Sequence, residues 1–193
     1  YLRLSLNWLR AGVLKTRNSV IQEEKKGRLI FGDQPDTKIK EHGVRYAIDL
    51  TTNRDASFYL DTRHLRKWLI DNMQGKSVLN TFAYTGSLGV AAMAGGASLT
   101  VQTDRNGLFL NLAKDSYSLN GFPIYNKDLV AQDFCPAVAK LKSTKQFFDC
   151  VIIDPPFFST TVKGKVDLEN DSTRLINKVR PLINDGGYLI AIN

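Results

Sequence analysis

Apolar and polar positions along the first half of the chain predict two helices separated by short strands. Residues 1–17 place Leu2, Leu6, Leu9 and Val13 on one helical face, which predicts an N-terminal helix. Short β-prone runs at 29–31 and 44–50, bounded by turn signals, predict a small antiparallel β-hairpin. A second amphipathic helix is predicted over 61–74, with Asp61 as its N-cap.

From Gly75 onward, apolar runs alternate with helical patterns. Strands are predicted over 77–82, 98–103, 128–132, 148–153 and 188–192, and helices over 88–93, 106–120, 135–142 and 172–183. Strands that are apolar on both faces and separated by helices are typical of a parallel sheet covered on both sides. The pattern therefore predicts a doubly wound α/β fold.

Composition narrows the class of protein. The 193 residues carry a formal net charge of +7, which favours a polyanionic partner such as nucleic acid. No apolar run approaches the roughly 18 residues of a membrane span. Two cysteines without a CxxC pair, together with two histidines, exclude a disulfide scaffold and a zinc cluster. We therefore expect a cytoplasmic protein without membrane or metal.

The ends of the chain lead to one further expectation. The first residue is Tyr1, not Met, and Asn193 follows directly after the last predicted strand. A strand needs neighbours to pair with, so we expect a piece of a longer protein, truncated at its C-terminus after the fifth strand. Within this piece we expect an N-terminal helix and hairpin appendage over 1–50 and the main α/β domain over 51–193.

The residues directly after the predicted strands carry the candidate chemistry, because ligands of such sheets bind beyond the carboxyl ends of the strands. Gly86 begins the first helix of the sheet domain, and Asp104 lies 18 residues later. In dinucleotide-binding units an acidic residue at about this spacing accepts hydrogen bonds from the ribose hydroxyls. This pair alone permits NAD, FAD or S-adenosylmethionine. However, the loop TFAYTGSLG lacks the GxGxxG motif of dinucleotide-binding proteins. The bulky side chains of Phe82 and Tyr84 would also hinder close approach of a pyrophosphate to the loop. Both observations disfavour NAD and FAD.

Two later strand ends extend the candidate site. Asp133 is either an acceptor for an adenine amine or the N-cap of the next helix. After 148–153 comes Asp154-Pro155-Pro156-Phe157, in which two prolines remove backbone donors and leave free carbonyls beside an acid. Such acceptors suit a planar group with N–H donors, and the aromatic ring can stack on a base.

Several blocks of sequence in the same order resemble class I S-adenosylmethionine-dependent methyltransferases, specifically the large-subunit ribosomal RNA base methyltransferases. These blocks are FYLDTR at 58–63, VLNTFAYTG at 78–86, GGA at 95–97, Asp104, NG at 120–121 and DCVIIDPPFF at 149–158. The resemblance implies a Rossmann-like fold and a methyl transfer to an RNA base. Ser57 stands where the family usually has Gly.

The resemblance also assigns roles to residues. It implies that the methionine part of S-adenosylmethionine is held by Asn80, Phe82, Tyr84, Thr85 and Gly86. It implies that Asp104 binds the ribose hydroxyls. The adenine ring is expected to lie near Arg105, Asn106, Asp133 and Phe134. Tyr59, Leu60 and Arg63 are expected near the cofactor, and Lys163 and Lys165 near the RNA.

The atom that is methylated stays open. For an exocyclic amine, Asp154 and the Pro155 carbonyl would accept the N–H bonds; guanine N7 needs positioning alone; cytosine C5 needs a cysteine thiolate. Cys150 lies inside a strand and Cys135 begins a helix, so neither is placed as that nucleophile. The alternatives are methylation of a protein amide or small molecule, a cofactor-binding module without independent activity, and an NAD-binding protein.

Overall fold

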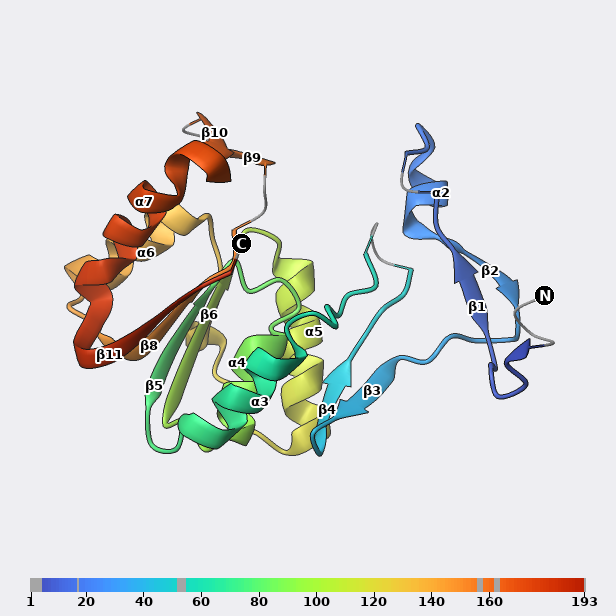
Figure 1. The fold of residues 1–193 in the computed structure, drawn as a ribbon, viewed down its shortest axis with the longest axis horizontal. Coiled ribbons are helices and arrows are strands. Elements are labelled where there is room, and N and C mark those ends of the chain that lie inside the picture. The colour runs from blue at the N-terminus through green and yellow to red at the C-terminus, as the bar shows by residue number, and fades with distance from the viewer. Residues whose placement is uncertain (1–4, 17, 52–54, 156–157, 162–163, 193) are drawn as a thin grey trace.

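The centre of the fold is a five-stranded parallel sheet (Figure 1). The computed structural model describes residues 5–16, 18–51, 55–155, 158–161 and 164–192. The strands are β5 (Ser77–Thr81), β6 (Leu99–Asp104), β7 (Leu129–Ala131), β8 (Phe148–Ile153) and β11 (Ile183–Ala191). Their order is β11-β8-β5-β6-β7, so the chain moves outward from β5 to β7 and then crosses back to β8. The strand order therefore reverses between β5 and β8.

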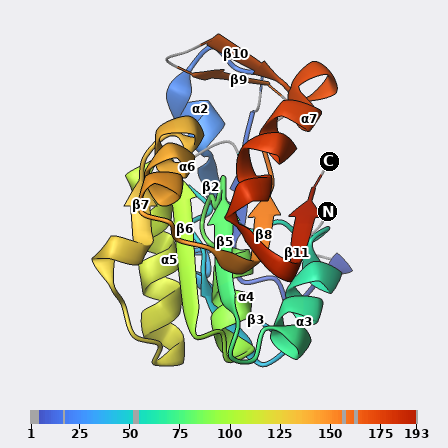
Figure 2. The same ribbon diagram turned by 90° about the vertical axis from the view of Figure 1, so that its left-hand side faces the viewer.

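Helices cover both faces of this sheet, as the sequence predicts. One face carries α3 (Arg63–Asn72), α4 (Ser87–Ala94) and α5 (Gly107–Asn120), and the other carries α6 (Phe134–Ser143) and α7 (Leu168–Val179) (Figures 1 and 2). Successive residues of β5 serve the two faces, because side chains alternate along a strand. Val78 packs with α3 and α4, whereas Leu79 packs with α6 and α7. The predicted doubly wound α/β fold is confirmed.

Element boundaries differ from the prediction mainly near the C-terminus. Helix α7 ends at Val179 and passes into a 3₁₀ turn, Arg180–Leu182, whereas the pattern predicts a helix as far as 183. Pro181 explains the early end, since its ring excludes an α-helical hydrogen bond and restricts the residue before it. The segment after Asp154, expected to be a loop, contains an antiparallel hairpin of β9 (Phe158–Thr161) and β10 (Gly164–Asp167). A second 3₁₀ turn, Asn126–Asp128, leads into β7.

The predicted N-terminal helix is wrong over the described residues 6–16, none of which is helical. Instead β1 (Gly12–Leu14) pairs antiparallel with β2 (Arg28–Phe31), and α2 (Gln22–Lys26) lies between them. Val13 faces Leu29 across the ladder, and a Cβ on Gly12 would lie 2.3 Å from the ring of Phe31. Pairing with a distant strand therefore outweighs the local helical spacing. Residues 1–4 lie outside the described part.

The two runs of the predicted hairpin both form strands, but they do not pair with each other: 29–31 lies in β2, which pairs with β1. The run from Val44 forms β4 (Val44–Ala47), which makes a hairpin with β3 (Lys38–Glu41) instead. Val44, Tyr46 and Ile48 are buried with residues of α4 and α5, so this hairpin packs on the main sheet domain. The unit of β1, α2 and β2 stands beside the domain in Figure 1. The division at residue 50 stays a prediction.

A buried arginine joins the hairpin to α3. The Arg66 side chain is fully buried, and its guanidinium donates to Glu41 at 2.6 Å, to the Tyr59 carbonyl at 2.9 Å and to the Thr62 hydroxyl at 2.6 Å. Thr62, and not the predicted Asp61, is the N-cap of α3, and its hydroxyl is used by Arg66 instead of by the helix. Arg66 also lies 4.0 Å from the centre of the Phe58 ring. One cation thereby fixes β3, α3 and the segment before it.

In the described part of the chain, no helix combines the length and the apolar character required to span a bilayer.

Arg66→Met is expected to lower the free energy of unfolding by about 3–5 kcal/mol, because it leaves the Glu41 carboxylate buried without its partner. Lys67→Ala is the matched control, since the neighbouring Lys67 forms an exposed pair with Asp71 that is worth about 0.3–0.5 kcal/mol. Urea unfolding of both variants measures the difference. Equal losses would contradict a structural role for the buried pair.

Candidate functional site

The carboxyl ends of the parallel strands meet along one edge of the sheet (Figure 2), where the four segments singled out from the sequence come together. Phe82 follows β5, Asp104 ends β6, Asp133 precedes α6 and Asp154 follows β8. The strand order reverses between β5 and β8, which is the position at which doubly wound sheets bind ligands. The segments after these two strands, with Phe82 and Asp154, therefore flank the expected binding position.

The loop after β5 has an unusual backbone. Phe82, Tyr84 and Gly86 all have positive φ angles, of 54°, 51° and 77°. Aromatic residues rarely adopt this left-handed conformation, so other contacts must hold it. The Ala83 N–H donates to the Thr103 carbonyl at 2.9 Å, and the Tyr84 N–H donates to Asp104 at 2.8 Å. Strand β6 thus sets the shape of the loop.

Gly86 is the N-cap of α4, and only glycine fits there. A Cβ on Gly86 would lie 2.5 Å from the Cβ of Ala113 on α5, and the positive φ angle also favours glycine. Helix α4 therefore begins at the strand edge with its first N–H groups beside the loop. Such an N-terminus stabilises an anionic group such as a carboxylate.

Asp104 has the acceptors that a ribose needs. Its two oxygens accept from the N–H groups of Tyr84 and Asn106, each at 2.8 Å. Burial raises the pKa of Asp104, against the lowering effect of these two bonds and of Arg105. A carboxylate has about four lone-pair positions, so two stay available for hydroxyl donors. The residues present therefore fit the ribose of a nucleoside cofactor.

Aromatic side chains line the same edge. The rings of Phe82 and Phe134 stack at 4.8 Å with an angle of 18° between them. Tyr84 contacts Tyr59 at 5.4 Å and Phe109 at 4.6 Å. Phe134 is buried in the cluster between the sheet and α6, so the ring of Phe82 packs against this core.

Two candidate adenine residues are helix N-caps. The Asn106 side chain accepts from the Leu108 N–H at 3.0 Å, so its amide oxygen is already used to cap α5. Asp133 occupies the N-cap position of α6, but its carboxylate makes no capping hydrogen bond. Asp133 therefore occupies the N-cap position, as one of the two interpretations predicts. Its side chain does not cap the helix, so the other interpretation, an acceptor for adenine, stays a prediction.

Asp154 lies half-buried at the end of β8, beside the buried Pro155. Burial, together with the charge of Asp61, raises the pKa of Asp154 to about 6. Burial raises the pKa of Tyr59, and the charges of Asp55 and Asp154 add to this effect. Pro156, Phe157 and Lys163 lie outside the described residues, and Lys165 is on β10.

The positions of four other expected cofactor residues do not by themselves indicate contact with a cofactor. Asn80 is buried under the loop and donates to Gln102 at 3.1 Å. The Arg63 guanidinium lies 3.9 Å from Glu41, on the hairpin side of α3. Leu60 is 75% exposed, and Arg105 is exposed beside Asp104. A role for these four in cofactor binding stays a prediction.

Sequence reasoning missed two buried polar residues that support the site. Gln102 on β6 packs against Gly86 and Gly89, where added Cβ atoms would lie within 2.8 Å of its side chain. A glutamine within an otherwise apolar strand is unusual, and this feature of the sequence could have identified Gln102 as a supporting residue. Ser57, with a φ angle of 58°, was noted only as a departure from the family's glycine.

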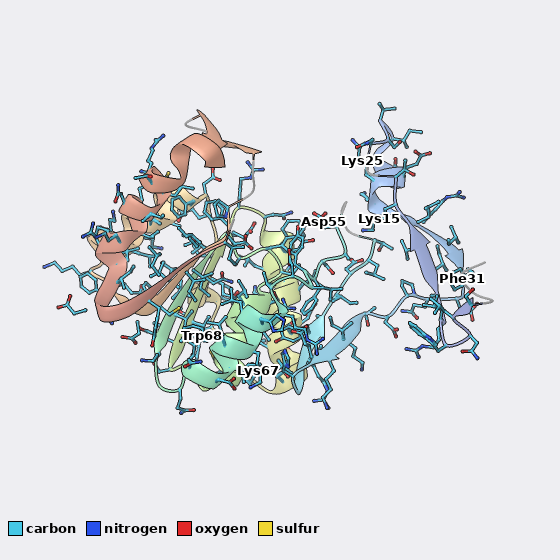
Figure 3. All side chains as sticks on the ribbon, in the orientation of Figure 1. Lys15, Lys25, Phe31, Asp55, Lys67 and Trp68 are labelled. Carbon is cyan, nitrogen blue, oxygen red and sulfur yellow. The ribbon has the colours of Figure 1, made fainter. Side chains whose placement is uncertain are left out.

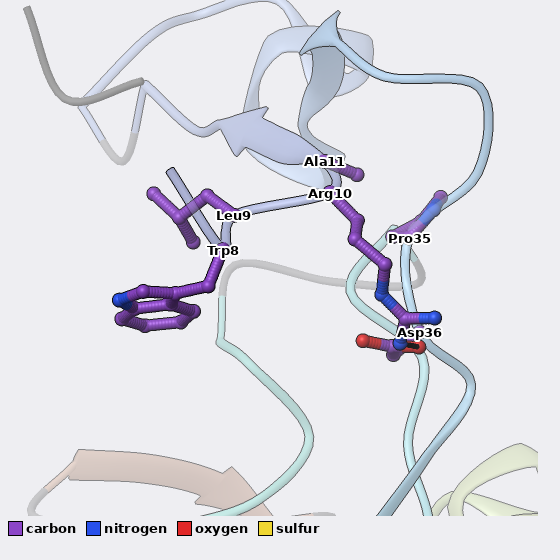
Figure 4. A pocket seen from close by; sticks show the side chains of 6 residues that line it. All are labelled: Trp8, Leu9, Arg10, Ala11, Pro35 and Asp36. Carbon is purple, nitrogen blue, oxygen red and sulfur yellow. Dashed lines mark hydrogen bonds and ion pairs between the residues drawn. The ribbon is translucent and has the colours of Figure 1, made fainter. Parts of the chain in front are cut away.

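A shallow depression lies elsewhere, on the N-terminal unit (Figure 4). It is lined by Trp8, Leu9, Arg10, Ala11, Pro35 and Asp36. Arg10 and Asp36 pair with each other at 2.6 Å in solvent. Exposed ion pairs contribute little to stability, so this pair does not hold the depression in a fixed shape. The edge of the sheet at the carboxyl ends of the strands is therefore the better candidate for the functional site.

Comparisons with known proteins bear on this site. The chain is 32% identical to ribosomal RNA large subunit methyltransferase K/L of Shewanella pealeana, over 94% of the chain and 25% of the relative. It is 30% identical to ribosomal RNA large subunit methyltransferase I of Photobacterium profundum, over 92% of the chain and 43% of the relative. The chain thus spans less than half the length of these relatives.

A solved structure and a family model agree with these relatives. The crystal structure of the methyltransferase SMU.776, complexed with SAH, superimposes with a TM-score of 0.79 at 27% identity, over 86% of this chain and 44% of that one. The sequence model described as S-adenosylmethionine-dependent methyltransferase matches residues 17–193. The predicted cofactor, S-adenosylmethionine, is confirmed. The chain belongs to the S-adenosylmethionine-dependent methyltransferase family.

Proposed function

We propose that the protein transfers a methyl group from S-adenosylmethionine to a base of ribosomal RNA. The names of the two relatives support ribosomal RNA as the substrate. The observation that carries the reaction is the position of Asp154, which ends the strand next to β5 and is half-buried beside a prolyl carbonyl. In this proposal the acid lies between the bound cofactor and the substrate base.

In this proposal the cofactor lies along the loop after β5. Asp104 binds the ribose hydroxyls with its remaining acceptor positions, and the methionine part faces Tyr84, Gly86 and the N-terminus of α4. Asp133 accepts from the adenine amine, since its carboxylate makes no bond to its own helix. The bound cofactor supplies an electrophilic methyl group on sulfur.

The substrate base lies against the segment after β8. The Asp154 carboxylate and the Pro155 carbonyl accept hydrogen bonds from a planar group, which orients the nucleophile for in-line displacement. Phe157 stacks on the base, and Lys163 and Lys165 bind the phosphates. Cys150 does not act as a nucleophile, because it is fully buried and burial raises its pKa to about 12.

Transfer of label from S-adenosylmethionine tests the substrate class. The protein is incubated with undermodified ribosomal RNA, with ribosomal proteins or with small amines. We expect label in the RNA alone. Label confined to proteins or small amines would support those alternative substrates and contradict the proposal.

Asp104→Asn is expected to weaken binding of S-adenosylmethionine by roughly 10- to 100-fold, because a hydrogen bond to a charged acceptor is worth about 1.5–3 kcal/mol. Titration calorimetry measures the affinity. Asp115→Asn, an exposed change on α5, is the control and should bind as the wild type does. An unchanged affinity in Asp104→Asn would place the ribose elsewhere.

Asp154→Ala is expected to lower the rate of transfer by at least roughly 100-fold, because the nucleophile is no longer aligned. Affinity for S-adenosylmethionine should stay within a few-fold of the wild type. Single-turnover rates and calorimetry separate the two effects. A large loss of affinity with little loss of rate would make Asp154 a cofactor ligand.

The rate should also depend on pH in a defined direction. Ionised Asp154 accepts hydrogen bonds at both carboxylate oxygens, whereas protonation turns one of these oxygens into a donor. We therefore expect kcat/KM to rise with pH through about 6, the pKa of the buried acid. Asp61→Asn removes a like charge that raises this pKa, and the acidic limb should move to lower pH. Asp71→Asn, at the other end of α3, is the control. An unmoved limb in Asp61→Asn would show that another group titrates.

A further inference from the structure

Ser57 adopts a backbone conformation that usually requires glycine. Its φ angle is 58°, and the residue is almost completely buried. A side chain in this left-handed region is strained, so contacts of the folded protein must compensate for the strain. This is the position at which the resembling family has Gly, so the serine calls for a physical explanation.

The hydroxyl of Ser57 provides that compensation. Its Oγ accepts from the Asp49 N–H at 2.7 Å and donates to the Ala56 carbonyl at 2.7 Å. The bond from Asp49 ties the chain after β4 to the segment before α3, whereas the bond to the adjacent Ala56 holds the Ser57 hydroxyl in place. A glycine would relieve the strain at this position but would make neither bond.

The carbonyl of Ser57 reaches the candidate cofactor loop. It accepts from the Thr85 hydroxyl at 2.7 Å, and Thr85 is buried as well. Thr85 lies between Tyr84 and Gly86, the residues whose positive φ angles shape the loop. The bond therefore connects two segments that are 28 residues apart in the sequence.

The segment held by this bond makes further contacts through Tyr59 and Asp55. Tyr59, two residues after Ser57, contacts the Tyr84 ring, its hydroxyl bonds to Asp55, and the charge of Asp154 contributes to raising its pKa. The Asp55 carbonyl in turn accepts from Lys15 of the N-terminal unit at 2.7 Å, and the two residues lie close together in Figure 3. Ser57 and Tyr59 thus connect residues 55–60 to the cofactor loop through a hydrogen bond and a ring contact.

We infer that the hydrogen bond from Thr85 to the Ser57 carbonyl is a latch that holds residues 55–60 against the loop after β5 and so shapes the cofactor site. Ser57 and Thr85 are positioning residues in this account, since the Thr85 hydroxyl is already bonded to protein. The inference rests on the proposed location of the cofactor. A merely structural bond would affect stability without a specific effect on cofactor affinity.

Thr85→Val tests the latch, because it removes the hydroxyl and keeps the shape of the side chain. We expect affinity for S-adenosylmethionine to fall roughly 3- to 10-fold, as for the loss of one neutral hydrogen bond. Thr85→Ser keeps the hydroxyl and should restore the affinity. Thr81→Val is the matched control, since the Thr81 hydroxyl makes a similarly buried bond to the Ile152 carbonyl within the sheet.

Calorimetric affinities and thermal melting of these variants decide the question. Equal losses of melting temperature in Thr85→Val and Thr81→Val, with an affinity loss only in the first, support the latch. An affinity loss in Thr85→Val no larger than in Thr81→Val, or no rescue by Thr85→Ser, would overturn it. If Asp104→Asn also binds normally, the proposed cofactor location fails too; if it binds weakly, only the latch fails.

Two changes at Ser57 provide a second test. Ser57→Ala keeps the strained backbone and loses the hydroxyl, whereas Ser57→Gly loses the hydroxyl and relieves the strain. We therefore expect a larger loss of cofactor affinity and of melting temperature in Ser57→Ala than in Ser57→Gly. Equal effects of the two changes would contradict the compensating role of the hydroxyl.

Discussion

The parallel pairing of β5 with both β6 and β8 is the constraint on which the rest of the structure depends. Because all three strands run in the same direction, the segments that follow them leave the sheet at one edge. Chain order then fixes what meets there: the loop after β5 lies between Asp104 at the end of β6 and Asp154 after β8. A shift of either pairing by one residue would turn the alternating side chains to the opposite faces and would dismantle both cores.

Asp104 and Asp154 illustrate how environment separates two identical residue types. Both are buried enough to raise their pKa values, but Asp104 accepts two backbone N–H groups, whereas the charge of Asp61 adds to the burial of Asp154. The two N–H bonds of the first acid oppose the effect of its burial on the pKa, and its remaining acceptor positions suit hydroxyl donors. Burial and the charge of Asp61 raise the pKa of the second acid to about 6, and a charged group bound beside it would shift this pKa further.

A layer of buried polar contacts holds the loops that carry these acids. Arg66 joins β3 to α3 and to the Tyr59 carbonyl, Gln102 packs under Gly86, and Thr85 bonds to Ser57. The Arg66–Glu41 and Thr85–Ser57 contacts connect residues that are 25 and 28 positions apart in the sequence. The strained backbone at Ser57 and Tyr84 persists because these contacts fix it from several sides.

Local sequence patterns were enough to predict the alternation of strands and helices, the doubly wound sheet and the position of Asp104 and Asp154 at strand ends. These features follow from local periodicity and from the residues next to each strand, which lie within a few positions of one another. Three features depend instead on contacts in the folded protein: residues 12–14 form a strand, Arg66 is buried and Ser57 binds Thr85. Their partners, in β2, β3 and the loop after β5, are distant in the sequence, and no local pattern encodes the pairing.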